Sequence, residues 1–305
     1  MFFAGRFAAG FMFVFMLLAF PAHAEAPKVV TTIAPLGGIA AAVMEGAGQP
    51  VVLLGSNDSP HTHQLSPMDA AHLMEADIIL WAGPGLESFL VKPMENLPRP
   101  SRVINLSKVE TLTRYFSRTG GVWEEDDHEG EHEQGGLDPH LWLDPDNAAV
   151  IAWMIAEKLA EKDFTRSETY RANARKFAER LKQEDAAIRA QLEPLGRKPF
   201  IVFHDAFQYF EKQYRLNGAG AITLSPDEQP SAGRVAQLRS RIEAQKVACV
   251  FAEPQFAPAL LTTLTEGTQV KTGTLNPDAS DLPLDANLYF NWLHRLADGF
   301  EECLK

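Results

Sequence analysis

The sequence predicts an α/β fold of two lobes, each with a mostly parallel sheet, joined by a single long rigid helix. Two observations lead to this prediction. Apolar, β-rich runs alternate with helix-like segments in both halves of the chain, which is typical of a parallel sheet covered by helices. Between the two halves lies an unusually long helical pattern, at residues 165–194, that could span both lobes.

The chain begins with a segment that is typical of a cleaved signal peptide. Arg6 supplies the positive start, residues 11–20 are apolar, and Ala22-His23-Ala24 forms an Ala-x-Ala cleavage site. A membrane anchor is the alternative, but the apolar stretch is short for a spanning helix. No cysteine lies near the site, which argues against a lipid anchor. We therefore expect residues 1–24 to be removed after Ala24, leaving a free periplasmic protein.

Length and charge limit the function classes. The mature chain has about 280 residues, which is enough for one large domain or two of ordinary size. The net charge of the whole chain is −12, and removing Arg6 makes it −13. This acidic balance disfavours nucleic acid as a partner.

The chain has two cysteines, Cys249 and Cys303. In an exported protein an even pair suggests a disulfide, which here would attach the last helix to a strand of the sheet. A cysteine-based metal site is the rival interpretation. It is weaker because the two cysteines are far apart and have no neighbouring histidine pattern.

The first half of the mature chain is assigned to an N-terminal lobe, residues 25–164. Pro67 and Asp69 fall in the first turn of one of its helices, where helix N-termini favour proline and acidic residues. The predicted strands are 29–33, 51–55, 77–82 and 102–106, and the predicted helices are 37–44 and 67–74.

An acidic segment at residues 124–136 interrupts the alternation. It contains seven acids and no apolar residue, together with His128 and His132. Such a segment cannot bury surface, so we expect a mobile loop. Its histidines among acids suggest an auxiliary metal-collecting site, and a solvated acidic loop is the alternative.

Two helices follow this loop. The first is expected at residues 146–161, with Asp146 as its cap. The second is the linking helix at 165–194, which begins with the capping-box pattern of residues 165–168 and ends at Pro194.

The remaining chain, residues 195–305, resumes the alternation and is assigned to a C-terminal lobe. The predicted strands are 200–203, 221–224, 247–252 and 270–275, and the predicted helices are 231–245 and 288–304.

Three histidines occupy comparable places in separate segments. His61 and His204 lie at or just past the end of a predicted strand, and His140 lies in a Pro-flanked segment. Strand ends in a two-lobed α/β protein face a shared cleft, and three imidazoles with an open fourth position are a recurring zinc arrangement. We therefore expect a metal site in the interlobe cleft. Asp205, next to His204, is a candidate for orienting its neighbourhood.

Other polar residues have weaker claims on this site. Asn276 lies at a strand end and could supply the fourth ligand, although an amide oxygen is a poor zinc ligand and water is an equal candidate. His63 could replace His61 as a ligand. His72 and His294 lie on predicted helices and are expected to be structural.

The residues around these histidines resemble the cluster A-I periplasmic solute-binding proteins. The similarity runs over essentially the whole mature chain. Residues in the second half of the chain resemble the zinc-specific branch of this family, the ZnuA proteins. The stretches that carry the resemblance are Pro60-His61 with Pro67 and Asp69, residues 138–145 (DPHLWLDP), 203–207 (FHDAF), 250–256 (VFAEPQF), 273–275 (GTL) and the two cysteines.

This resemblance implies a zinc-capturing component of an ABC importer, with the metal between two α/β lobes. It implies His61, His140 and His204 as ligands of one tightly bound Zn²⁺, and a disulfide between Cys249 and Cys303. The implied partners are an inner-membrane permease with its ATPase, and a periplasmic zinc chaperone is a further candidate. We expect a monomer.

The sequence departs from the family pattern at two places. Asn276 stands where the family usually has an acid, and because manganese-type members generally use two carboxylates, this argues against manganese. The acidic loop holds only His128 and His132, whereas this loop is often longer and richer in histidine in zinc-type members.

Three functions compete. Capture and delivery of Zn²⁺ needs no catalytic group, and we see no catalytic constellation, so we expect no enzyme. A zinc-dependent metallohydrolase is the alternative, because His61-x-His63 resembles the paired histidines of amidohydrolases. The long helix interrupts the barrel that those enzymes need, and an HExxH pattern is absent. The third function is binding of manganese or another transition metal. Three imidazoles without a firm carboxylate favour zinc over manganese, although copper or nickel would bind in vitro by intrinsic affinity.

Overall fold

The structure is a computed structural model, and it describes most of the chain after the first 24 residues. The predicted signal peptide lies outside the described residues, as do His128 and His132. The described ranges are residues 25–55, 58–98, 102–119, 123, 136–224, 230–255 and 259–305.

The first sheet has four parallel strands in the order β2-β1-β3-β4. Strand β3 is apolar and buried along its whole length, as expected for a strand with helices on both faces. The strands are β1 (Val29–Thr31), β2 (Val51–Val52), β3 (Ile78–Trp81) and β4 (Val103–Asn105). The accompanying helices are α1 (Ala34–Val43), α2 (Pro67–Glu75) and α3 (Val91–Glu95), with 3₁₀ turns η1 (Ser88–Leu90) and η3 (Leu106–Lys108).

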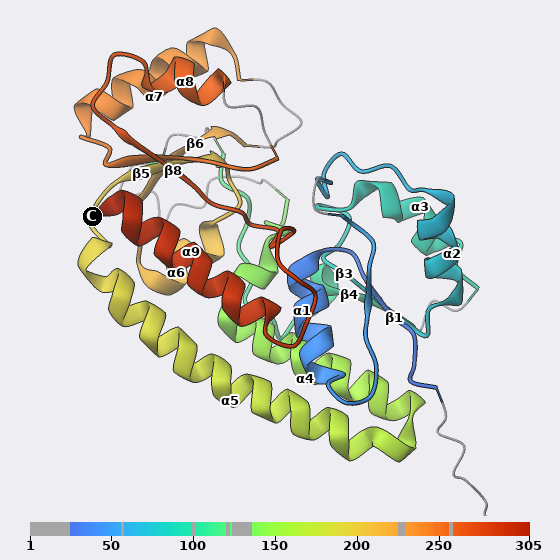
Figure 1. The fold of residues 1–305 in the computed structure, drawn as a ribbon. Helices are drawn as coiled ribbons and strands as arrows, with labels where there is room; N and C mark the ends of the chain where they lie inside the picture. Colours follow the sequence, from blue (N-terminus) through green and yellow to red (C-terminus); the bar gives the residue numbers. More distant parts are fainter. Residues whose placement is uncertain are drawn as a thin grey trace, which may run out of the picture.

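The second sheet repeats the arrangement with parallel strands in the order β6-β5-β7-β8. Helices α7 and α8 cover one face of this sheet, and α6 and α9 lie on the other (Figure 1). The strands are β5 (Phe200–His204), β6 (Gly218–Thr223), β7 (Cys249–Ala252) and β8 (Lys271–Thr274). The helices are α6 (Gln208–Tyr214), α7 (Ala232–Ala244), α8 (Ala259–Thr265) and α9 (Leu288–Leu304). The predicted fold class is confirmed.

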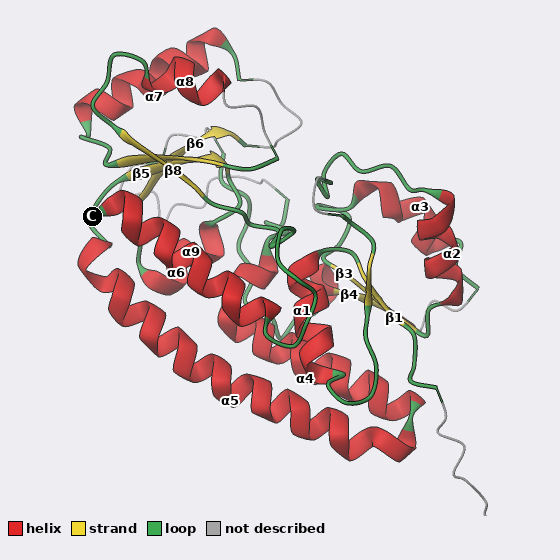
Figure 2. Cartoon of the chain, in the orientation of Figure 1, coloured by secondary structure: helices red, strands yellow, loops and turns green. Residues whose placement is uncertain are grey.

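Two long helices lie side by side along the two lobes, α4 (Pro145–Lys162) and α5 (Ser167–Leu192), as Figure 2 shows. The predicted long helix is therefore present, but both predicted caps are wrong. Asp144, and not Asp146, caps α4 by accepting a hydrogen bond from the backbone N–H of Asp146 (2.8 Å). Before α5 the chain makes a 3₁₀ turn, η5 (Phe164–Arg166), and α5 has no side-chain cap.

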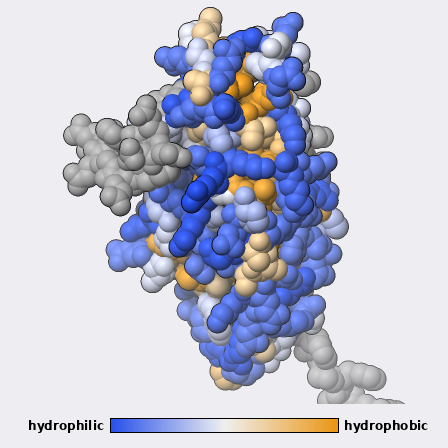
Figure 3. Space-filling view, turned by 90° about the vertical axis from the view of Figure 1, so that its left-hand side faces the viewer, coloured by the Kyte–Doolittle hydropathy of each residue, from blue (hydrophilic) through white to orange (hydrophobic). Residues whose placement is uncertain are grey.

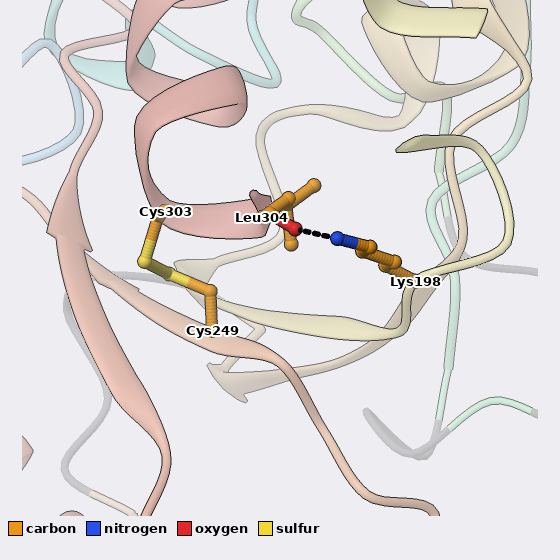
Figure 4. The surroundings of a disulfide bond; sticks show 4 residues. All are labelled: Lys198, Cys249, Cys303 and Leu304. Atoms are coloured by element: carbon orange, nitrogen blue, oxygen red, sulfur yellow. Dashed lines mark hydrogen bonds between the residues drawn. A yellow bond between two sulfur atoms is a disulfide. The ribbon is translucent and has the colours of Figure 1, made fainter. Parts of the chain in front are cut away.

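Helix α9 makes a second connection between the lobes. Its C-terminal end is joined to β7 by the disulfide Cys249–Cys303, which confirms the predicted pairing (Figure 4). Beside the bridge, Lys198 Nζ donates to the carbonyl of Leu304 (2.5 Å). The N-terminal end of α9 packs closely on α1, because a Cβ added at Gly38 would lie 3.0 Å from the backbone nitrogen of Tyr289.

The hydrophobic core follows these connections. One continuous cluster of buried side chains includes residues of both sheets, such as Ile79 of β3 and Phe251 of β7, and a smaller cluster lies beneath α7 and α8. The lobes therefore share a core and do not meet only at a linker. Figure 3 shows a mainly hydrophilic outer surface on the side it displays. Within the described ranges, every helix is too short or too polar to cross a membrane.

Candidate metal centre

Three histidines from separate segments converge between the two sheets. His61 lies in the loop after β2, His140 immediately precedes the 3₁₀ turn η4 (Leu141–Leu143), and His204 is the last residue of β5. One ring nitrogen of each lies within 4.8 Å of the other two. The Nε2 atoms of His140 and His204 are 3.4 Å apart. Among the described residues, this is the one group of histidines, cysteines and acids with this geometry.

Two of these histidines are each held twice by one carboxylate oxygen. Asp138 Oδ1 accepts from the backbone N–H of His140 (3.0 Å) and from its Nδ1 (2.8 Å). Glu253 Oε1, at the end of β7, accepts from the backbone N–H of His204 (3.1 Å) and from its Nδ1 (2.6 Å). A proton on Nδ1 places the ring's lone pair on Nε2, so Nε2 is the atom of both rings that could coordinate a metal.

Burial and neighbouring charges give the three imidazoles different pKa values. Burial, with a smaller contribution from the two neighbouring imidazoles, lowers the pKa of His61 to about 2. Burial also lowers the pKa of His140 well below its ordinary value. Burial opposes protonation of His204 as well, but the charge and hydrogen bond of Glu253, with Asp278 and Asp205, outweigh it and raise the pKa above 6.5.

A hydrogen-bonded layer fixes Asp138. Gln208 of α6 donates its amide to Asp138 Oδ2 and to the carbonyl of Phe116, both at 3.0 Å. The hydroxyl of Tyr209 donates to the carbonyl of Asp138 (3.1 Å). Burial raises the pKa of Asp138 to about 6. The carboxylate behind His140 is therefore held by residues of the second lobe.

Arg118 joins the segment before the acidic loop to the second lobe. Its Nε donates to Asp205 (3.0 Å), and its Nη1 donates to Glu211 of α6 (2.6 Å). Its guanidinium carbon lies 3.6 Å from the ring centre of Trp123. Asp205, predicted to orient its neighbourhood, is thus paired with an arginine that the sequence did not single out.

Asn276 is buried, and its amide is committed to its own loop. Its Oδ1 accepts from Gln255 Nε2 and from the backbone N–H of Asp278, both at 3.1 Å. Its Nδ2 donates to Asp281 Oδ1 (2.9 Å). Both lone pairs of the amide oxygen therefore already have donors.

Two buried carboxylates near the histidine cluster were missed by sequence reasoning. Burial raises the pKa of Asp278 to about 7, with His204 opposing this shift, and it raises the pKa of Glu87 to about 7 as well. Glu87 accepts from Thr32 Oγ1 (2.5 Å) and from the backbone N–H of Gly83 (2.9 Å). Glu87 follows the end of β3 by six residues, and this position beyond a strand end is the signal that could have identified it.

The other histidines that the structure describes lie outside the cluster. His63 Nε2 donates to Asp69 Oδ2 (3.2 Å) at the start of α2. His72 is half-buried on α2. His294 pairs through Nε2 with Glu184 of α5 (2.9 Å). The cluster contains His61 and not His63, because the ring of His63 faces α2.

The chain is similar to known proteins over most of its length. Residues 29–303 match the family model described as ZnuA, zinc-uptake complex component A, periplasmic. The chain is 36% identical over 308 residues to the high-affinity zinc uptake system protein ZnuA of Brucella abortus (strain 2308), covering 92% of each chain. It is 36% identical over 303 residues to the protein of the same name from Yersinia pestis, covering 95% of each.

A solved structure reported as a crystal structure of ZnuA has the same fold. It superposes with a TM-score of 0.76 at 24% identity, covering 92% of this chain and 100% of the other. The family match spans nearly the whole chain after the first 28 residues. The chain therefore belongs to the ZnuA family of periplasmic components of zinc-uptake complexes.

Proposed function

We propose that this protein is a periplasmic solute-binding protein that captures Zn²⁺ and delivers it to an ABC-type importer. The observation that carries the proposal is the convergence of three histidines, two of them fixed by carboxylates, in the shared core between the lobes. Three neutral imidazoles around one position suit zinc. The names of the relatives, high-affinity zinc uptake system proteins, support the same cargo.

We propose His61, His140 and His204 as the zinc ligands and water at the fourth position. Asn276 was the other candidate for that position. Its amide oxygen already accepts two hydrogen bonds, so coordinating zinc would require it to give up a donor, which favours water.

The binding proposal is tested by equilibrium dialysis of the metal-free protein. We expect one tightly bound Zn²⁺ per chain, and we expect His140→Ala to lose tight binding because the ligand count falls to two. His294→Ala is the matched control, because it removes an imidazole that pairs with Glu184 away from the cluster. Wild-type protein without a tight site, or His140→Ala with wild-type affinity, would refute the proposal.

Selectivity is tested by competition. Manganese prefers oxygen ligands, whereas this cluster offers imidazole nitrogens, so we expect Zn²⁺ to displace Mn²⁺ at equal concentration. Metal analysis of the protein after dialysis against both ions measures the outcome. Retention of Mn²⁺ would assign the protein a different cargo within the same family.

The remaining proposals concern location, partners and activity. We propose that residues 1–24 direct export and are cleaved after Ala24, which mass spectrometry of the secreted protein would test. We propose an inner-membrane permease with its ATPase as the receiving partner, and a monomeric, non-enzymatic protein. A screen of the zinc-loaded protein against esters, amides and phosphates tests the last point, because turnover would favour the metallohydrolase alternative.

A further inference from the structure

The three histidines of the cluster differ in how firmly they are held. The rings of His140 and His204 are buried, and each is bonded at Nδ1 to a carboxylate. The ring of His61 is half-buried and has no hydrogen bond to the described part of the chain. Its backbone N–H donates to Ser59 Oγ at 3.3 Å. The position of His61 therefore depends on the loop that carries it.

That loop, residues 58–66, is closed at both ends by local contacts. At its start, Asp58 Oδ2 accepts from the backbone N–H of Gly55 (2.9 Å). At its end, Ser66 and Asp69 form a reciprocal capping box on α2, in which Asp69 Oδ2 accepts from the backbone N–H of Ser66 (2.8 Å). These contacts fix the two ends of the loop. In its middle, a turn carries His61, in which the backbone N–H groups of Thr62 and His63 donate to the carbonyl of Ser59 (3.2 and 3.0 Å).

The side chain of His63 joins this turn to the start of α2 and to η1. Its Nε2 donates to Asp69 Oδ2 at 3.2 Å, and its ring lies edge-on to Phe89 of η1 with ring centres 5.0 Å apart. The oxygen that closes the capping box therefore also holds His63. The pattern matches the one at Asp138 and Glu253, where one carboxylate oxygen accepts both a backbone N–H and an imidazole.

We propose that the His63–Asp69 hydrogen bond is a latch that positions His61 and sets how slowly the site releases its metal. His63 is a positioning residue in this proposal, because it acts through the loop and lies outside the cluster. It lies two positions after His61, so a loop that shifts at His63 moves His61 away from the other two imidazoles, which stay fixed by their carboxylates. The proposal rests on the proposed metal-binding function of the cluster.

Two substitutions of His63 with similar volume separate the hydrogen bond from the packing. His63→Gln keeps an N–H donor that can reach Asp69, whereas His63→Leu fills the space against Phe89 without a donor. His72→Ala is the control, because it removes an imidazole from α2 outside the loop. Each metal-free variant is first checked for an unchanged melting temperature, since a latch on a surface loop should contribute little to global stability.

The rate of Zn²⁺ loss is then measured by rapid mixing of the loaded protein with excess chelator. We expect His63→Leu to release zinc about 10-fold faster or more, the scale seen when supports of metal ligands are removed, and His63→Gln and His72→Ala to stay within about 3-fold of wild type. Equal rates for His63→Leu and wild type would overturn the latch, as would equally fast release from His63→Gln. A wild-type protein that binds no zinc would instead overturn the proposed function.

Discussion

Removing the Cys249–Cys303 disulfide is expected to lower the free energy of unfolding without weakening metal binding. The bridge joins residues 54 positions apart. For a closed loop of that size the chain-entropy relation gives about 14 cal/mol/K, or about 4 kcal/mol at 25 °C. Since about 1.4 kcal/mol corresponds to a factor of ten, the variant Cys249→Ala/Cys303→Ala should shift its unfolding equilibrium by nearly three orders of magnitude.

Urea unfolding followed by far-UV circular dichroism and by tryptophan fluorescence measures this loss. The two probes are needed because a two-lobed chain need not unfold in one step. Chemically reduced wild-type protein is the matched control, since it lacks the bridge but keeps both sulfur atoms in the core. A loss shared by the variant and the reduced protein belongs to the bridge, and any excess in the variant belongs to the truncated side chains.

Metal affinity should be unchanged because the bridge and the site lie at opposite ends of α9. Near its start, the hydroxyl of Tyr289 donates to the carbonyl of Trp142 (2.7 Å), and Trp292 Nε1 donates to the carbonyl of Asn276 (2.8 Å). These bonds hold the segments that flank the site. A stability loss below about 1 kcal/mol would refute the entropic argument. A drop in zinc affinity of more than about tenfold would refute the separation of bridge and site.

Three further predictions concern the surroundings of the cluster. Glu253→Gln and Asp138→Asn should each lower zinc affinity by about 10- to 100-fold in chelator competition, because the ring of the supported histidine loses its charged partner; unchanged affinity in both would contradict this role. The pKa of His204 is raised above 6.5 while those of the other two imidazoles are lowered, so zinc should displace one proton below about pH 6.5. Zinc affinity should therefore fall about tenfold per pH unit in that range and be constant above the pKa of His204. A slope near three in a plot of log affinity against pH would show that all three rings titrate together. Arg118→Met leaves two buried acids, Asp205 among them, without their cation and should cost about 3–5 kcal/mol in urea unfolding, whereas a loss under about 1 kcal/mol would mean that the acids find other partners.

The sequence located the three imidazoles because each signal was local. His61 and His204 follow apolar runs that form strands, and His140 lies between prolines. The supports of the histidines were harder to foresee. Asp138 is two residues from His140 and could have been proposed, but Glu253 comes from another strand, 49 residues beyond His204, and pairs with it only because β5 and β7 are neighbours in the sheet.

The errors in the predicted helix starts have a similar cause. Asp144 and Asp146 are both acceptable caps by residue type, and the choice depends on which backbone leaves the helical conformation. The capping-box pattern before α5 failed because Thr165 Oγ1 donates to Asp163 instead (2.6 Å), which belongs to the turn joining the two helices. A pattern of four residues carries no information about such a competing partner.

Residues 115–117 and 136–138 form a paired stem at the base of the acidic segment, and this stem affects how the sequence can change over evolutionary time. Phe116 and Leu137 pair as an isolated antiparallel bridge, the backbone N–H of Ser117 donates to the carbonyl of Gly136, and that of Asp138 donates to the carbonyl of Tyr115 (both 2.9 Å). The two ends of the segment are thus joined at one stem, directly before His140. Beyond the stem, Arg118 pairs with Asp205 and the backbone N–H of Trp123 donates to the carbonyl of Ala219 (3.3 Å). Because these contacts precede residue 124, changes of length or composition within residues 124–135 need not disturb the cluster, so that part is free to diversify while the site geometry stays fixed.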